Sequence, residues 1–178
     1  AIYEDDFWKK QYDGKHGYEI LADNTVEELK HIHAVYDLAK EQGDITDSSY
    51  EALEKRWKDE NAERSEKVEK GEVIYGLKEY TFQLYLDYEI STLKEKYCND
   101  TNREGMKLTE DEIQEHYQSR EWIFGDSDEN ADLEMARIAV ERELREQKYD
   151  DMITQRETDS QVAGNMENVN RLTLKNIQ

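Results

Sequence analysis

Four histidines and one cysteine are the side chains best suited to bind a metal or to act as a nucleophile. His31 and His33 are two residues apart, which places them on different faces of a helix. No His-x-x-x-His pair is accompanied by a third ligand at a useful spacing, so we expect no metal site. No nucleophile signature surrounds Cys98, and we interpret this residue as a small side chain at a helix end.

Other catalytic and cofactor motifs are missing. The sequence contains no phosphate-binding loop, no dinucleotide-binding fingerprint and no Gly-x-Ser-x-Gly motif. The acidic segment 126–130 is similar in composition to a calcium-binding loop, but it lacks the central glycine and the terminal glutamate of an EF-hand. Carboxylates are abundant, yet no pair stands in an apolar setting that would favour acid–base catalysis. We therefore predict a protein that is not an enzyme and binds no cofactor.

The charge of the chain restricts its partners. Asp and Glu number 44 and Lys and Arg number 24, which gives a net charge of −20. Such a field repels phosphates, so nucleic acids and anionic lipid surfaces are excluded and basic partners are favoured. Solvated, Glu-rich helix faces are the alternative explanation of the charge. No apolar run approaches 18 residues, so no segment is expected to span a membrane.

The elements that must carry these residues are helices. The chain has no proline and eight glycines, a pattern that favours helices separated by glycine and polar turns. Caps mark two of the starts, since Ser48 with Glu51 and Thr109 with Glu112 each form a predicted capping box. Hydrophobic periodicity predicts helices over the ranges 3–12, 18–42, 48–70, 78–97, 109–117 and 131–155.

We expect an all-α fold with an irregular arrangement of several helices. Only 36% of the residues are hydrophobic and 38% are charged, so the core should be thin. The 178 residues form one predicted domain, with an N-terminal extension at 1–17 and a helical lobe at 18–155. The tail 156–178 should pack back on the lobe, and its segment 169–177 is predicted to be a short strand or a frayed end.

Aromatic residues are the most informative part of the composition. Twelve tyrosines and three tryptophans occur in a chain that is poor in aliphatic residues, and such side chains tolerate partial exposure and contact varied partners. A groove for apolar peptides is one interpretation, and a wet, tyrosine-rich core is the other. The candidate groove residues are Trp57, Tyr75, Tyr80, Phe82, Tyr85, Tyr88 and Trp122.

Three segments, in this order along the chain, resemble the extracytoplasmic foldases of the SurA/PrsA type. Residues 18–43, which end in Ala-Lys-Glu-Gln-Gly, are similar to the N-terminal chaperone helix of that family. Residues 108–117 resemble its helix start T-x-E-E-I-x-x-Y-Y, and residues 139–153 resemble the long helix that follows. Together these segments and the helix after Gly43 cover about two thirds of the chain.

The resemblance implies a non-catalytic chaperone lobe that binds unfolded or translocating polypeptides. It further implies a place outside the cytoplasmic membrane, as a cell-envelope lipoprotein of a Gram-positive bacterium whose lipid anchor lies outside this chain. The interval 125–131 is too short for the prolyl isomerase domain that many family members carry, so isomerase activity is not expected. The alternative is a protein that binds one specific partner or its own copy, which leaves a homo-oligomer open.

Overall fold

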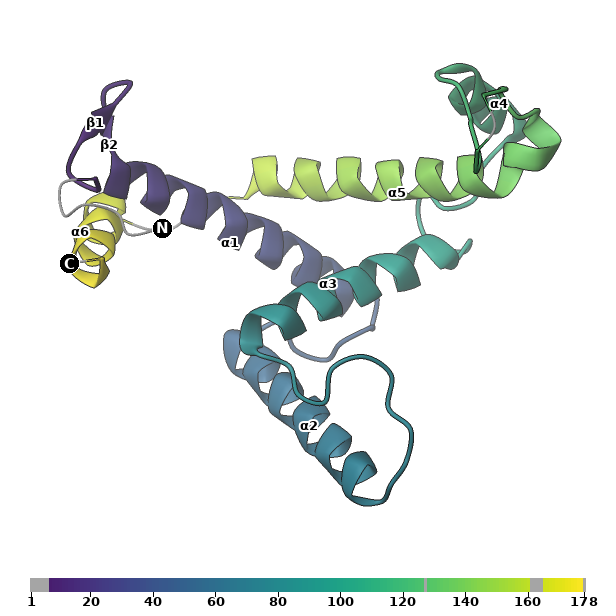
Figure 1. Cartoon of the computed structure of the whole chain (residues 1–178). Coiled ribbons are helices and arrows are strands. Elements are labelled where there is room, and N and C mark those ends of the chain that lie inside the picture. Colours follow the sequence, from purple (N-terminus) through teal and green to yellow (C-terminus); the bar gives the residue numbers. More distant parts are fainter. Residues whose placement is uncertain (1–6, 127, 161–164, 178) are drawn as a thin grey trace.

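The computed structural model describes residues 7–126, 128–160 and 165–177. Within these ranges the chain forms six helices and one hairpin of two short strands, so the all-α expectation is confirmed (Figure 1). The strands are β1 (Gln11–Tyr12) and β2 (Lys15–His16). The helices are α1 (Gly17–Glu41), α2 (Tyr50–Glu69), α3 (Phe82–Asn99), α4 (Glu110–Gln118), α5 (Leu133–Asp159) and α6 (Met166–Asn176).

Side-chain caps set where the helices begin. α4 begins as predicted, because the Thr109 hydroxyl accepts a hydrogen bond from the Glu112 N–H and the Glu112 carboxylate accepts one from the Thr109 N–H. The cap of α2 is Ser49 rather than the predicted Ser48. α3 begins at Phe82, later than predicted, because Thr81 supplies its cap.

The predicted helix 3–12 is wrong over its described part. Residues 1–6 lie outside the described residues, and Gln11–Tyr12 pairs with Lys15–His16 as an antiparallel hairpin. Asp13 and Gly14 form its turn, with φ angles of 50° and 86°. An Asp-Gly pair suits this turn because both central residues need positive φ.

Both alternatives for residues 169–177, a short strand and a frayed end, are also wrong, because α6 covers this segment up to Asn176. The side chain of Asn165 caps the helix by accepting a hydrogen bond from the Glu167 N–H. The partly buried residues recur at helical spacing, and α6 packs against α1. These residues are Met166, Val169, Asn170, Thr173, Leu174 and Ile177.

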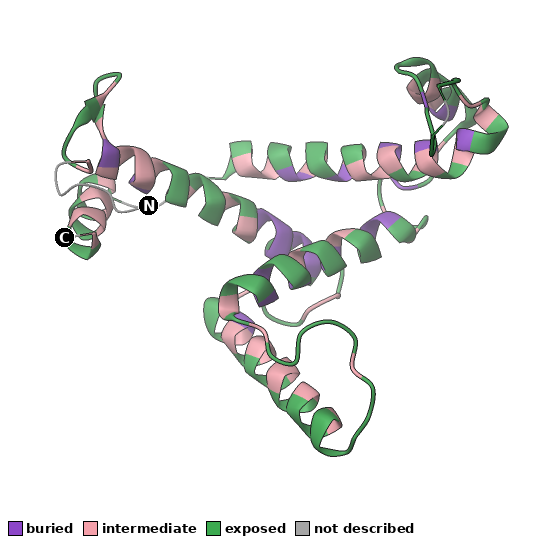
Figure 2. Ribbon diagram, in the orientation of Figure 1, coloured by how far each residue is buried: buried purple, intermediate pink, exposed green. Residues whose placement is uncertain are grey.

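Burial is concentrated at two places. The larger core lies where α1, α3 and the C-terminal half of α5 meet, and it includes Tyr36, Tyr97 and Ile153. A smaller core lies between α4 and the start of α5, around Trp122 and Val140. Figure 2 shows buried positions gathered near these junctions, while the outer parts of the helices are mostly exposed.

The molecule is open in shape. Helix α2 and the loop 71–81 form an arm at the bottom of Figure 1, and α4 with the start of α5 forms a separate end at the upper right. The chain exposes 12869 Å². A compact monomer of 21.2 kDa would expose about 9,100 Å². Much of this protein's surface is therefore available for contacts with other molecules.

Candidate functional site

A buried carboxylate fixes the root of the arm. Glu89 of α3 is 8% exposed, and it accepts hydrogen bonds from the Tyr36 hydroxyl at 2.5 Å and the Tyr85 hydroxyl at 2.9 Å. Arg56 of α2 donates to the same carboxylate through Nε at 2.7 Å and Nη2 at 3.1 Å. One carboxylate thus joins α1, α2 and α3, with each of its oxygens paired.

This network shifts the proton affinities of its members. Burial raises the pKa of the Tyr36 and Tyr85 hydroxyls, and the adjacent Glu89 carboxylate raises them further. Burial alone would lower the pKa of the Arg56 guanidinium, but its hydrogen bonds to Glu89 outweigh this effect and raise it. The tyrosines are therefore neutral hydrogen-bond donors at ordinary pH, which suits a structural joint.

The loop 71–81 is held along α2 by side chains of that helix. The Asn61 amide nitrogen and Trp57 Nε1 both donate to the Tyr80 carbonyl oxygen, at 2.9 Å and 2.7 Å. Arg64 Nη1 donates to the carbonyl oxygens of Tyr75 and Leu77, at 3.1 Å and 2.8 Å. Because these bonds satisfy backbone groups of the loop, its path is held although most of its side chains are exposed.

Aromatic rings connect the loop to α3. Tyr80 stacks on Tyr88 with ring centroids 5.3 Å apart, and the Arg64 guanidinium lies over the Tyr80 ring at 4.6 Å. The Phe82 ring centroid lies 5.6 Å from the Trp57 ring centroid and 5.7 Å from the Tyr50 ring centroid. The rings thus form two clusters, which the hydrogen bond from Trp57 Nε1 to the Tyr80 carbonyl connects. One cluster consists of Tyr50, Trp57 and Phe82, and the other consists of Tyr80, Tyr85 and Tyr88.

Within and around the two ring clusters, large apolar side chains remain in contact with solvent. Leu84 and Tyr88 are four residues apart on α3, so they lie on the same helix face. We call the exposed set the arm surface. Its members are Tyr50, Val73, Tyr75, Leu77, Leu84 and Tyr88.

The structure brings together most of the predicted groove residues. Trp57, Tyr80 and Phe82 are partly buried members of the two ring clusters and Tyr85 is a buried member, whereas Tyr75 and Tyr88 are exposed on the arm surface. Trp122 lies elsewhere. It is 3% exposed in the smaller core, where its indole N–H donates to the Tyr117 carbonyl.

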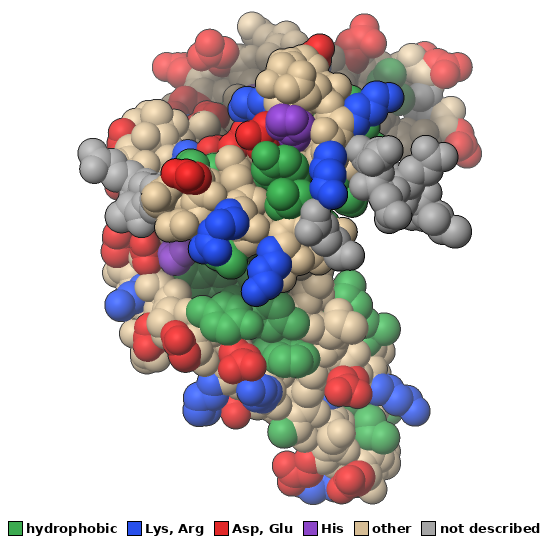
Figure 3. Space-filling view, turned by 90° about the vertical axis from the view of Figure 1, so that its left-hand side faces the viewer, with side chains coloured by type: hydrophobic (Ala, Val, Ile, Leu, Met, Phe, Trp, Pro, Cys, Tyr) green, Lys and Arg blue, Asp and Glu red, His purple; other side chains and the backbone are tan. Residues whose placement is uncertain are grey.

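Sequence reasoning missed several exposed members of the arm surface. Tyr50, Val73, Leu77 and Leu84 were not among the candidates, because apolar residues at helical spacing and beside a short apolar link are also typical of a core. The spacing of Leu84 and Tyr88 does indicate a shared helix face, but spacing alone does not show that this face is exposed. Figure 3 shows hydrophobic side chains gathered in a hollow above the arm, with lysine and arginine side chains along its upper edge.

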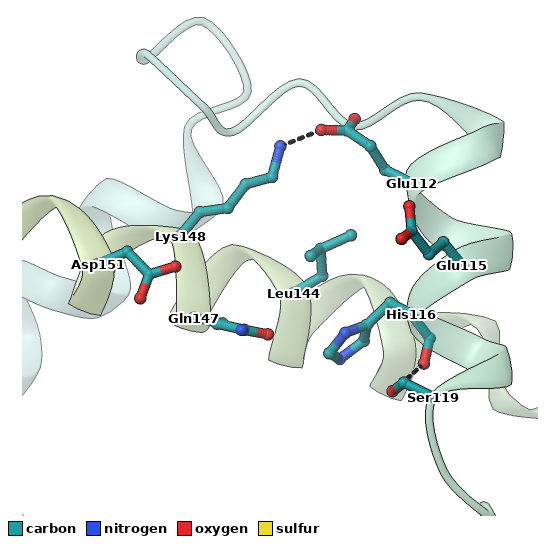
Figure 4. A pocket seen from close by; sticks show the side chains of 8 residues that line it. All are labelled: Glu112, Glu115, His116, Ser119, Leu144, Gln147, Lys148 and Asp151. Carbon is teal, nitrogen blue, oxygen red and sulfur yellow. Dashed lines mark hydrogen bonds and ion pairs between the residues drawn. The ribbon is translucent and has the colours of Figure 1, made fainter.

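A second concave feature lies between α4 and α5 (Figure 4). Its volume is about 350 Å³, and Leu144 lies among otherwise polar lining residues. An ion pair joins Lys148 to Glu112, and the His116 ring points toward α5, where its Nε2 lies 3.2 Å from Glu143 Oε1 outside hydrogen-bond geometry. The lining residues are Glu112, Glu115, His116, Ser119, Leu144, Gln147, Lys148 and Asp151.

The charges around this pocket serve to hold α4 on α5. Lys148 and the Thr109 cap, through their hydrogen bonds, lower the pKa of the Glu112 carboxyl to about 2. Within the ranges that the structure describes, no three His, Cys, Asp or Glu side chains are placed to hold a metal ion. Among the same residues, no helix has the length and apolar character that crossing a membrane requires.

A comparison with curated proteins finds one informative relative. The chain is 31% identical over 152 residues to a protein of Bifidobacterium longum subsp. longum named "Chaperone for lacto-N-biosidase". The relative is a chaperone by name. The match covers 85% of this chain and 54% of the relative, so the chain spans about half the length of the protein it matches.

Two further comparisons give no match. No family model matches the chain. No solved structure matches it either. The chaperone character implied by the sequence resemblance thus agrees with the name of the relative, whereas the SurA/PrsA type stays a prediction.

Proposed function

We propose that this chain is the client-binding part of a chaperone that assists the folding of one partner enzyme, lacto-N-biosidase or an enzyme like it. The proposal is supported by the similarity over 85% of the chain to a protein named for that role. It combines the two interpretations of the sequence, since a dedicated chaperone is both a chaperone and a protein with one specific partner. The role requires no catalytic group.

The observation that carries the proposal is the arm surface. Tyr75 is 88% exposed, although the backbone around it is hydrogen-bonded to Arg64. Exposed apolar groups on a fixed backbone can contact an unfolded segment without the ordering cost that a flexible loop would add. Tyrosines add polar tips, which allow varied contacts with a client that has not reached its native form.

The remaining surface suits the same role. The net charge of −20 keeps a complex with a partly folded client soluble, because charged complexes repel one another. The open shape provides long edges on which an extended client can lie. We further propose that the protein acts outside the cytoplasmic membrane, at the cell envelope, as the resemblance to SurA/PrsA-type foldases implies.

A refolding assay tests the proposal. Chemically denatured lacto-N-biosidase of Bifidobacterium longum would be diluted into buffer with and without this protein, and recovered activity and light scattering would be measured. A dedicated chaperone should raise the recovered activity at near-equal molar ratio and leave unrelated denatured proteins unaffected. Protection of every client would point to a general holdase. No effect on any client would refute the proposal.

Matched variants connect the activity to the arm surface. Leu84→Ser combined with Tyr88→Ser should reduce the recovered activity, because it removes apolar groups that are 46% and 43% exposed. Leu29→Ser combined with Leu172→Ser is the control, since these side chains are 47% and 50% exposed on α1 and α6. Exposed positions are preferable to Tyr85 and Trp57, whose loss would disturb the hydrogen bonds that hold the arm.

A further inference from the structure

A second apolar surface lies at the end of the molecule formed by α4 and the start of α5. Ile138 is 85% exposed and Met135 is 71% exposed, both on the first turns of α5. Phe124 in the preceding loop is 42% exposed and lines one cavity together with Met135 and Ile138. We call these three residues the α5 patch. Clusters of exposed apolar groups of this kind mark interaction sites.

The α5 patch includes a shallow cavity. Its volume is about 260 Å³, and it is lined by Phe124, Met135, Ile138, Ala139 and Arg142. Methionine is flexible and polarisable, so Met135 can adapt to apolar groups of different shape. The cavity is wide enough to receive one large aliphatic or aromatic side chain.

The patch is held in place by the smaller core. Ala136 and Val140 are fully buried on the opposite face of α5, which turns Met135 and Ile138 outward. The preceding loop is closed by two hydrogen bonds, from the Ala131 N–H to the Trp122 carbonyl at 2.8 Å and from the Trp122 N–H to Asn130 Oδ1 at 2.5 Å. The patch is therefore formed before any partner arrives.

The charges around the patch define the partner. Residues 121–142 contain seven carboxylates and two arginines. Glu121, Asp126, Asp128 and Glu134 are exposed, and none of them forms an ion pair with another described residue. A second copy of this chain would bring the same negative charge against the patch and would be repelled. A segment with apolar and basic side chains would be attracted.

We propose that the α5 patch binds a client segment in which large apolar residues are interspersed with lysine or arginine. The proposal rests on the proposed chaperone function and adds a second contact to the arm surface. The two surfaces lie at separate ends of the molecule (Figure 1). A client that touches both is held by two linked contacts, which strengthens capture more than either contact alone.

Fluorescence anisotropy with three labelled peptides of equal length tests the binding chemistry. One peptide combines leucine with lysine, one combines leucine with glutamate, and one combines serine with lysine. We expect measurable binding only of the leucine–lysine peptide, and weaker binding when the salt concentration rises from about 0.05 M to about 0.5 M. Equal binding of the serine–lysine peptide would overturn the proposal, because attraction would then be a matter of net charge alone.

A pair of matched variants places the binding on the patch. Met135→Ser combined with Ile138→Ser should weaken binding of the leucine–lysine peptide by about tenfold, because two apolar contacts are lost. Leu29→Ser combined with Leu172→Ser should leave it unchanged. Circular dichroism checks that both variants keep the helical fold. An unchanged affinity in the α5-patch variant overturns the proposal, as does concentration-dependent dimerisation that this variant abolishes.

The refolding assay separates this inference from the proposed function. If the wild-type chain assists lacto-N-biosidase and the α5-patch variant does so equally well, the chaperone function stands and the second contact is refuted. If the wild-type chain assists no client while the peptide binding is lost in the variant, the α5 patch is a binding surface with another role and the proposed function is refuted.

Discussion

The side-chain amide of Asn61 pairs with both backbone groups of Tyr80. Its oxygen accepts from the Tyr80 N–H at 2.8 Å, and its nitrogen donates to the Tyr80 carbonyl at 2.9 Å. A single side chain on α2 thereby replaces the partner that a neighbouring strand would give to this part of the loop. This pairing helps to hold the loop that carries Val73, Tyr75 and Leu77 of the arm surface.

Asn61→Ala should release the loop 71–81 from α2. The expected loss of stability is about 1–3 kcal/mol, since the partly buried Tyr80 N–H loses its partner and the Tyr80 carbonyl keeps only its bond from Trp57 Nε1. Hydrogen–deuterium exchange of the loop amides should quicken, and recovery of the client enzyme should fall. Asn168→Ala, at an exposed position of α6, is the control. Unchanged exchange in the loop would show that other contacts suffice to hold it.

Glu89→Gln should destabilise the joint between α1, α2 and α3. The substitution leaves the Arg56 guanidinium without its charged partner, and breaking a largely buried pair costs about 3 kcal/mol. Urea unfolding followed by circular dichroism measures the effect. Glu95→Gln on the exposed face of the same helix should change stability by less than about 0.5 kcal/mol. Equal effects of the two substitutions would contradict a special role for Glu89.

The attachment of α4 should weaken in acid. The pKa of Glu112 is lowered from 4.5 to about 2, so the charged form of this carboxyl is favoured in the folded state. Its contribution to stability is therefore present above about pH 4.5 and is lost as the pH falls toward 2. NMR titration of the Glu112 carboxyl carbon measures this pKa. Lys148→Ala should move it back toward 4.5, and a titration near 4.5 in the unmodified protein would refute the prediction.

Cys98 should be inert in the folded protein. Burial raises the pKa of its thiol to about 11, and the side chain is 5% exposed, so almost no reactive thiolate is accessible at pH 8. A chromogenic disulfide reagent should report no free thiol until denaturant is added, and then one per chain. Rapid reaction without denaturant would show that α3 and α5 separate easily.

The helices were predictable because their signals are local. The Thr109 cap and the turn at Gly43 act through residues close in sequence, and both ends lie within one residue of the prediction. The Asp13-Gly14 turn is an equally local signal for the N-terminal hairpin, and it conflicts with the predicted helix 3–12. The helix in segment 169–177 is not predictable from the sequence pattern. A few aliphatic residues near a chain end fit both a helical and a strand period, and only their contact with α1 decides between the two.

The candidate site was only partly predictable, because exposure is decided by contacts between helices. Tyr85 and Tyr88 are three residues apart on α3, yet Tyr85 is buried in the larger core while Tyr88 is exposed. Trp122 is a large aromatic residue like these tyrosines, but it belongs to the smaller core. No pattern within a single helix distinguishes these cases, since each depends on which neighbouring helix covers the residue.

The open arrangement of α2, α4 and α6 around α1, α3 and α5 has a hydrodynamic consequence. A compact chain of 178 residues would have a radius of gyration of about 16 Å, and this chain must exceed that value because its arms extend from the centre. It will diffuse slowly for its mass and leave a gel-filtration column early, at the position of a larger globular protein. Its oligomeric state therefore has to be measured by sedimentation equilibrium or by mass, since elution volume alone would make a single chain look like a dimer.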